Sequence, residues 1–142
     1  MEGQVLDSSQ KALSINLDRT IYGTFAEIGA GQEIARNFFV VGGASGTIAQ
    51  SLSAYDMAMS DSLYGERPGR YVCKARLEQM ISYEYNRLIS ELSTKKPEKR
   101  FFALADTVEA INYDRSNKSH GWMGVRFQLN PGEDYNDVII HI

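Results

Sequence analysis

The sequence predicts an α+β domain whose helices, in the first two-thirds of the chain, pack on a small, mainly antiparallel sheet formed by the C-terminal third. Three observations lead to this fold class. The clearest helical pattern lies in the middle of the chain, β-type patterns follow one another after residue 100, and no segment is repeated. The composition, 43% hydrophobic and 23% charged over 142 residues, is typical of one globular domain.

The amino-terminal segment is expected to contribute little to the core. Residues 1–12 are predicted to form a flexible tail, and residues 13–142 a single α+β domain. Leu13, Ile15 and Leu17 alternate with polar residues, a pattern that predicts a short, half-exposed strand.

Residues 20–41 permit two interpretations. They fit either one continuous helix or a strand, a loop and a helix over residues 24–28, 29–31 and 32–39. A glycine inside a helix costs about 1 kcal/mol relative to alanine, so the continuous helix needs tertiary contacts to hold it. We prefer the continuous helix nevertheless, because the alternative strand has only four or five residues.

Two further helices are expected in the middle of the chain. Residues 42–46 read as a connector, after which Ser45 or Thr47 would cap a helix. The apolar face of that helix would consist of Ile48, Leu52, Tyr55 and Met59. A loop is predicted between residues 61 and 69, and residues 72–92 carry a regular apolar stripe that predicts the longest helix.

The last third of the chain has the pattern of consecutive strands. Residues 101–105 form a buried-strand run, residues 123–129 alternate, and residues 130–134 have the composition of a turn before a final strand at 137–142. That strand runs to the end of the sequence without a polar tail, so we expect the domain to be the amino-terminal part of a longer protein.

Charge and cysteine content exclude several classes of function. The formal net charge is −3, which argues against nucleic-acid binding because that requires a clustered basic surface. Cys73 is the sole cysteine, so no intrachain disulfide is possible. The amino terminus lacks the pattern of a signal peptide, and no stretch approaches the ~20 apolar residues that span a bilayer. We expect a cytoplasmic protein that binds no membrane.

The second glycine cluster is the first candidate binding site. If residues 42–47 turned into the start of a helix, the backbone N–H groups there would favour an anion such as a phosphate or a carboxylate. The candidate ligand-binding residues are Gly42, Gly43, Ser45, Gly46 and Thr47. No lysine follows as in a Walker loop, and the alternative is a plain connector.

The first glycine cluster has a weaker resemblance to a cofactor site. The string from Glu27 to Gly31 resembles the first motif of S-adenosylmethionine-dependent methyltransferases. However, the next glycine cluster follows after about two helical turns, which we judge too few for a crossover between parallel strands. We therefore expect no cofactor.

Polar residues on the predicted strands form the second candidate site. Asp106, His120, Arg126 and His141 would supply a carboxylate, two imidazoles and a guanidinium for acid–base chemistry, and they are the candidate catalytic residues. Two histidines and one aspartate could also make a minimal metal site. Their spacing matches no metal motif, so we expect no metal.

Five strings in the sequence resemble a bacterial protein family. They are IYGTFAEIGAGQE, SAYDM, FFALADT, HGWMGVRFQ and DVIIHI. The members of that family are longer soluble proteins with no established activity, and the resemblance implies that this chain is their amino-terminal domain. Names attached to the family include TonB-dependent receptor and nicotinate-nucleotide adenylyltransferase. The residues here support neither name, because an export signal and a paired-histidine motif are both missing.

Two functions follow from these observations. The leading hypothesis is a non-catalytic assembly domain, whose partner is the rest of a longer polypeptide or a second copy of the chain. The alternative is a domain that binds or transforms a phosphate- or carboxylate-bearing ligand at residues 42–47. Convergence of Asp106, His120 and Arg126 beside that loop would favour the alternative.

Overall fold

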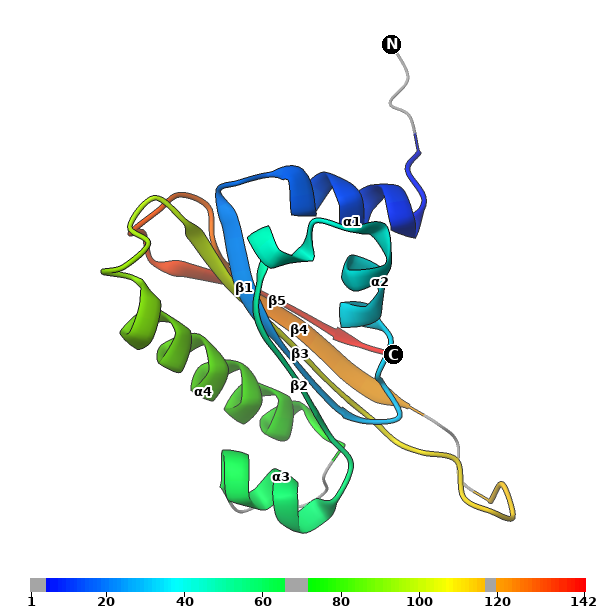
Figure 1. Cartoon of the computed structure of the whole chain (residues 1–142). Coiled ribbons are helices and arrows are strands. Elements are labelled where there is room, and N and C mark those ends of the chain that lie inside the picture. The colour runs from blue at the N-terminus through cyan, green and yellow to red at the C-terminus, as the bar shows by residue number, and fades with distance from the viewer. Residues whose placement is uncertain (1–4, 66–71, 117–119) are drawn as a thin grey trace.

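One mixed five-stranded sheet, in the order β2-β1-β3-β4-β5, carries helices on both of its faces (Figure 1). The computed structural model describes residues 5–65, 72–116 and 120–142. The strands are β1 (Ile21–Gly29), β2 (Ile48–Ala54), β3 (Arg100–Val108), β4 (Gly121–Gln128) and β5 (Tyr135–His141). The helices are α1 (Ser8–Leu17), α2 (Ile34–Val41), α3 (Met57–Tyr64) and α4 (Lys74–Leu92), with a 3₁₀ turn at Ala44–Gly46.

The first three strands form a parallel unit that the sequence analysis missed. β1 lies between β2 and β3 and is parallel to both. α2 connects β1 to β2 on one face, whereas α3 and α4 connect β2 to β3 on the other face (Figure 1). The predicted class, α+β, is confirmed. The expectation of a mainly antiparallel sheet built by the last third of the chain is wrong, because β1 and β2 come early and are parallel.

The preferred continuous helix over residues 20–41 is wrong, and the strand, loop and helix are right. β1 is buried on both faces over residues 23–28, which include the polar Thr24 and Glu27, so its sequence shows no alternation of apolar and polar residues. Gly29, at φ +76°, ends the strand in a backbone conformation that favours glycine. The crossover that we judged too short exists, because α2 needs only eight residues.

The predicted helix after Thr47 is also wrong, because residues 48–54 form β2 and a separate helix follows. The carboxylate of Asp56 accepts a hydrogen bond from the N–H of Met59 (3.0 Å), so α3 begins there and not at Ser45 or Thr47. β2 is an edge strand; Ser51 and Ser53 are exposed, whereas Gln50, of opposite parity, accepts a hydrogen bond from Arg87 of α4.

α1 replaces the strand expected at Leu13–Leu17. Asp7 and Gln10 form a reciprocal capping box at its start, and the helix includes residues 8–12 of the expected tail. Asn16, which is buried, donates hydrogen bonds from its side chain to the carbonyl oxygens of Phe38 and Gly42, both at 2.9 Å. These bonds fix α1 to the end of α2.

The remaining predictions for the second half are confirmed. α4 occupies the predicted 72–92 segment, and β3, β4 and β5 form the antiparallel meander with a turn at 130–134. The predicted loop over residues 61–69 is wrong for residues 61–64, which lie in α3, and residues 66–69 lie outside the described residues. None of the described helices is both long and apolar enough to cross a membrane.

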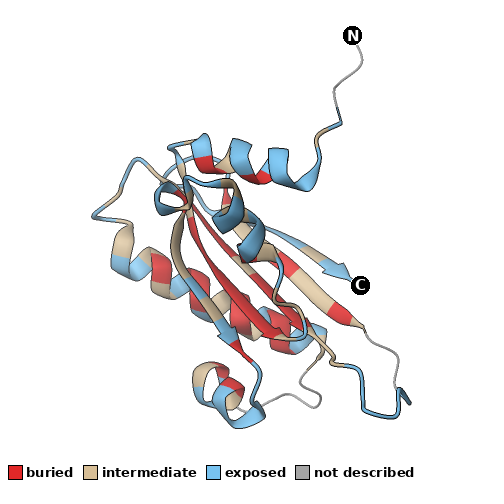
Figure 2. Ribbon diagram, turned by 45° about the vertical axis from the view of Figure 1, so that its right-hand side comes forward, coloured by how far each residue is buried: buried red, intermediate tan, exposed pale blue. Residues whose placement is uncertain are grey.

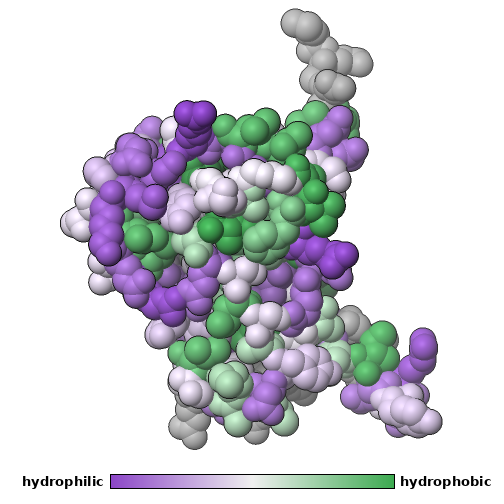
Figure 3. Space-filling view, viewed as in Figure 1, coloured by the Kyte–Doolittle hydropathy of each residue, from purple (hydrophilic) through white to green (hydrophobic). Residues whose placement is uncertain are grey.

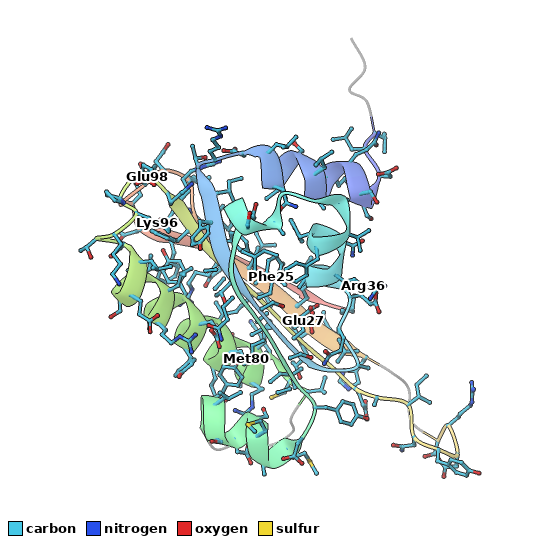
Figure 4. All side chains as sticks on the ribbon, in the orientation of Figure 1. Phe25, Glu27, Arg36, Met80, Lys96 and Glu98 are labelled. Atoms are coloured by element: carbon cyan, nitrogen blue, oxygen red, sulfur yellow. The ribbon has the colours of Figure 1, made fainter. Side chains whose placement is uncertain are left out.

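Two apolar clusters fill the two faces of the sheet. Leu77, Met80 and Ile81 of α4 pack on one face, and Phe25 packs with Phe102 and α2 on the other (Figure 4). The fully buried residues lie along β1, β3 and the inner side of α4 (Figure 2). The helices leave part of the α2 side open, because β5 has no described helix over it there (Figure 2).

Candidate functional site

The carboxyl ends of β1, β2 and β3 meet at one edge of the sheet, which we call the carboxyl edge. The chain leaves β1 towards α2 on one face and leaves β2 towards α3 on the other. Ligands of open α/β sheets bind in the crevice at such a change of direction. The segments that border the carboxyl edge are therefore the place to search for a site.

Two carboxyl groups face each other on the α2 side of this edge. Glu27 of β1 lies opposite Asp106 of β3 in the strand register, and both are buried. The Glu27 carboxylate accepts hydrogen bonds from the backbone N–H groups of Ile34 (2.9 Å) and Ala35 (3.3 Å), so it lies at the start of α2 (Figure 4). The helix dipole favours a negative charge at that position. Glu27 is thus held as the charged member of the pair.

Asp106 is the protonated member of the pair. Burial of its carboxyl, followed by its hydrogen bond to Glu27 and the charge of Glu27, raises the pKa of Asp106 to about 9. Two adjacent buried carboxylates cannot both ionise without a large electrostatic cost, so they share one proton at neutral pH. The pair can therefore hold a proton and donate a hydrogen bond.

The loop between β1 and α2 encloses the pair. A Cβ on Gly31 would lie 2.6 Å from Oδ1 of Asp106, so only glycine fits above this carboxyl. Oδ1 itself is buried without a hydrogen-bond partner among the described residues. Gln32 closes the loop, because its Nε2 donates to the carbonyl oxygen of Gly29 (2.9 Å) and its Oε1 accepts from the hydroxyl of Ser53 on β2. A ligand reaches Asp106 only if this loop moves.

The α3 side of the same edge is hollow. We call this cavity, of about 370 Å³, the carboxyl-edge pocket; it lies between α3, the ends of β1 and β3, and the segment after β3. Its lining includes Ile28, Tyr55, Met57, Ser60, Glu109 and Asn112. The Ser60 side chain is 1% exposed, and its hydroxyl oxygen has no hydrogen-bond partner among the described residues. The lining residues that the structure describes include Asp56 and Glu109 but no lysine or arginine.

Two of the predicted catalytic residues, His120 and His141, contact each other, and His120 also reaches Glu109 of the pocket lining. Nε2 of His120 lies 3.1 Å from Oε2 of Glu109, and the His120 ring lies edge-on to the His141 ring at 5.7 Å. His141 stacks on Trp122 with ring centroids 4.2 Å apart. No three His, Cys, Asp or Glu side chains of the described ranges come close enough to hold a metal ion.

The other two predicted catalytic residues lie apart from the histidines. Asp106 is opposite Met123 in the register whereas Trp122 is opposite Thr107, so Asp106 and the histidine cluster are on opposite faces of the sheet. Arg126 is further along β4, where its guanidinium donates two hydrogen bonds to Asp137, at 2.9 and 3.0 Å. Arg126 also lies over the ring of Tyr135, 3.9 Å from its centroid.

The predicted ligand loop, residues 42–47, lies at the end of the sheet opposite the carboxyl edge, where β1 and β2 begin. The N–H of Gly23, near the start of β1, donates to the carbonyl oxygen of Thr47 (2.8 Å), which immediately precedes β2. Gly42 and Gly43 adopt positive φ values of 87° and 79°, and they connect α2 to a three-residue turn. None of the four predicted catalytic residues lies beside this loop, and ligand binding there stays a prediction.

The sequence analysis missed the residues that make the carboxyl edge polar. The sequence analysis preferred a helix for the segment that contains Glu27. Recognising this segment as the end of a strand buried on both faces would have identified Glu27 as a candidate site residue. Ser60 and Asn112 carried no signal, because a serine in a helix and an asparagine in a loop are ordinary residues. Their proximity depends on the crossover of α3 and α4 over the sheet.

Comparison with known proteins gives a fold but no activity. No family model matches the sequence, and no curated protein does. Solved structures match over nearly the whole chain. A competence/damage inducible protein from Agrobacterium tumefaciens aligns with a TM-score of 0.66 and 16% identity, over 99% of this chain and 83% of that one. CinA superfamily proteins from Enterobacter cloacae and Escherichia coli give TM-scores of 0.62 and 0.61 with 12% and 10% identity, each over 99% of this chain and 81% of theirs.

This chain has the fold of the CinA superfamily proteins. The match corrects the family expected from the five strings in the sequence, because the structures that align over the whole chain are competence/damage inducible proteins. The identities are too low to carry the role of any residue from those proteins to this one. The candidate site therefore rests on its own geometry.

Proposed function

We propose that this domain binds a small organic molecule in the carboxyl-edge pocket. The observation that carries the proposal is the Ser60 hydroxyl, which is buried without a described partner and lines a cavity of about 370 Å³. A buried hydroxyl without a partner costs roughly 1–3 kcal/mol, and a ligand that hydrogen-bonds to it would remove that cost. The volume falls within the range of small-molecule sites, ~300–1,000 Å³.

The lining indicates the chemical class of the ligand. Asp56 contributes an exposed carboxylate to the lining, Glu109 contributes a second one that is paired with His120, and Ile28 and Met57 provide an apolar wall. A ligand with a flat or apolar body and a neutral or positively charged polar group fits this lining, whereas a phosphate or carboxylate would be repelled. The ligand class therefore differs from the anion that we expected at residues 42–47.

Fragment binding followed by ¹⁵N NMR tests this proposal. Neutral and cationic heteroaromatic fragments are expected to shift the amide signals of Tyr55, Ser60 and Glu109, whereas anionic fragments of equal size are not. Asn112→Trp places a bulky ring at the exposed rim of the pocket and should abolish these shifts. Asn130→Trp, in an exposed turn at the other end of the sheet, is the matched control and should leave them unchanged. Equal shifts in both variants would refute the pocket as the site.

Assembly is a second candidate function, and a specific surface favours it. On the α2 side, an apolar groove of about 300 Å³ runs between α1, α2 and the sheet, lined mainly by residues such as Ile15, Phe38, Leu104 and Val125. Figure 3 shows further apolar side chains over α1 and α2, where Leu17 and Val40 are exposed. Contiguous apolar surface of this kind is typical of protein interfaces. Light scattering over a concentration series tests this function, because assembly predicts a mass that rises with concentration.

A further inference from the structure

We propose that two copies of this chain associate through strand β5, which pairs antiparallel with β5 of the second copy about a two-fold axis at Ile139. The five-stranded sheet of each copy would then continue into the other. The proposal makes the second candidate function specific, and it is independent of ligand binding in the carboxyl-edge pocket.

β5 is an edge strand, and no strand of the described residues pairs with its outer side. Gly121 of β4 and Ile142, which follows β5, exchange two backbone hydrogen bonds, of 2.9 and 2.8 Å. From this pair onward, hydrogen-bonded and non-hydrogen-bonded residue pairs alternate along β4 and β5. By that alternation, the N–H and C=O groups of Asp137, Ile139 and His141 point away from β4. The strand contains no lysine, proline or bulge, which are the devices that normally prevent edge-to-edge pairing.

Side-chain chemistry selects the register of the pairing. The antiparallel registers with the longest overlap are centred on Asp137, Val138 or Ile139. A centre at Asp137 places two carboxylates opposite each other, and a centre at Val138 places Asn136 opposite Ile140. A centre at Ile139 places Asp137 opposite His141 of the second copy, so that a carboxylate meets an imidazole.

The same register matches the apolar side chains on the open face. Val138 of one copy lies opposite Ile140 of the other, and these side chains are 48% and 46% exposed in the isolated chain. Both point to the α2 side, where no described helix lies over β5. Pairing would join them into one apolar stripe across the two-fold axis. The occupant of this edge is therefore a second copy, because β5 complements itself in both charge and apolar pattern.

Cysteine cross-linking tests the register directly. In a Cys73→Ser background, Ile139→Cys places the two thiols opposite each other at the two-fold axis, within the distance that a disulfide needs. Asn136→Cys, on the same strand, is the matched control, because this register separates the two Asn136 positions by about 20 Å. Mild oxidation should give a covalent dimer for Ile139→Cys and none for Asn136→Cys, with circular dichroism confirming that both fold. Equal cross-linking of the two variants would overturn the register.

A charge substitution tests the surface without relying on cross-linking. Val138→Lys combined with Ile140→Lys places lysines opposite each other across the axis, and both positions are half-exposed, so the monomer should keep its fold. Leu129→Lys combined with Ile111→Lys adds the same charge at exposed positions outside β5. We expect the native chain and the control to be dimeric by light scattering and the β5 variant to be monomeric. A monomeric native chain, or a dimer that survives both lysines in β5, would contradict the proposal.

Discussion

The parallel and antiparallel halves of the sheet differ in how deeply their polar side chains are buried. In the parallel half, β2, β1 and β3 lie between helices, and the carboxyl groups of Glu27 and Asp106 are buried at the carboxyl edge. In the antiparallel half, β4 and β5 carry an ion pair whose Arg126 and Asp137 side chains are 12% and 33% exposed, and β5 is an edge strand. Burying the polar groups of the parallel half costs folding free energy, whereas the more accessible polar groups of the antiparallel half cost less.

This difference bears on which half of the sheet is suited to ligand binding and which to association. A polar group that is buried at a cost in stability is typical of a binding or catalytic site. An exposed strand with little charge is typical of an interface. The comparison is consistent with the proposals of a ligand site in the parallel half and of association through the antiparallel half, and the following substitutions test the energetic basis of that division.

The largest effect is expected for glycine substitutions that test packing in the two halves. In Gly23→Ala on β1, the new Cβ would lie 2.3 Å from the carbonyl oxygen of Phe102 and 2.4 Å from its ring, and the backbone cannot yield without breaking strand pairing. We expect the free energy of unfolding to fall by about 3 kcal/mol. In Gly124→Ala on β4, the nearest atom is the flexible end of Ile81 at 2.8 Å, and we expect a loss of about 1 kcal/mol. Urea denaturation measures both, and equal losses would contradict the comparison.

The second-largest effect is expected for Asp106→Asn, which should raise the free energy of unfolding by an amount that depends on pH. The raised pKa means that folded Asp106 keeps its proton between about pH 4 and 9, whereas the unfolded chain loses it. The native free energy of unfolding therefore falls as pH rises through that window, by up to 1.36 kcal/mol per pH unit for one proton. Asp106→Asn removes this titration, so the variant should be more stable by roughly 2 kcal/mol at pH 7. Urea denaturation at pH 4, 5.5 and 7 should show a difference that widens with pH, and a constant difference would refute the assignment.

The other member of the pair should respond in the opposite direction. Glu27→Gln removes the charge at the start of α2 and leaves one of the two backbone N–H groups without its acceptor. We expect a loss of about 1–2 kcal/mol in the free energy of unfolding. Thermal unfolding monitored by circular dichroism measures it, with Glu33→Gln, at the exposed helix start, as the control. An equal loss in the control would show that charge near α2, and not the hydrogen bonds of Glu27, is responsible.

The smallest effect is expected in the antiparallel half. Arg126→Lys keeps the charge but loses the two parallel hydrogen bonds to Asp137 and the contact with the Tyr135 ring. Because this pair is partly exposed, the loss should be below about 1 kcal/mol, and it should shrink as salt is added. Urea denaturation at low and high ionic strength measures it. A loss as large as that of Gly23→Ala would contradict the comparison, because substitutions in the two halves would then destabilise the fold equally.

The same division explains how much of the fold could be predicted from the sequence. β4 places Met123, Val125 and Phe127 on the α2 side and Gly124, Arg126 and Gln128 on the other, so its residues alternate and predict a strand. β1 is covered on both faces, so its apolar and polar residues do not alternate, and the pattern fits a helix equally well. α1 was read as a tail and a strand because three alternating residues were taken as the signal, and the capping pair of Asp7 and Gln10 was not considered.

The candidate site could be predicted only in part. Asp106 was selected by its residue type and its place on a strand, and it proved to be buried at the carboxyl edge. Its neighbours Glu27 and Gly31 could be recognised only once residues 24–39 were known to form a strand, a loop and a helix. Ser60 reaches the edge through the crossover of α3, and the spacing of residues along the chain contains no information about such a contact.

The strand order has a consequence for the synthesis of this protein. β1 lies between β2 and β3 and is the first strand made, yet the pairing of Ile21 with Arg100 requires a segment made about 80 residues later. At typical rates of translation, ~5–20 residues per second, β1 waits roughly 4–16 s with one edge and one apolar face uncovered. Nascent chains that stop before β3 should therefore be the species that chaperones capture.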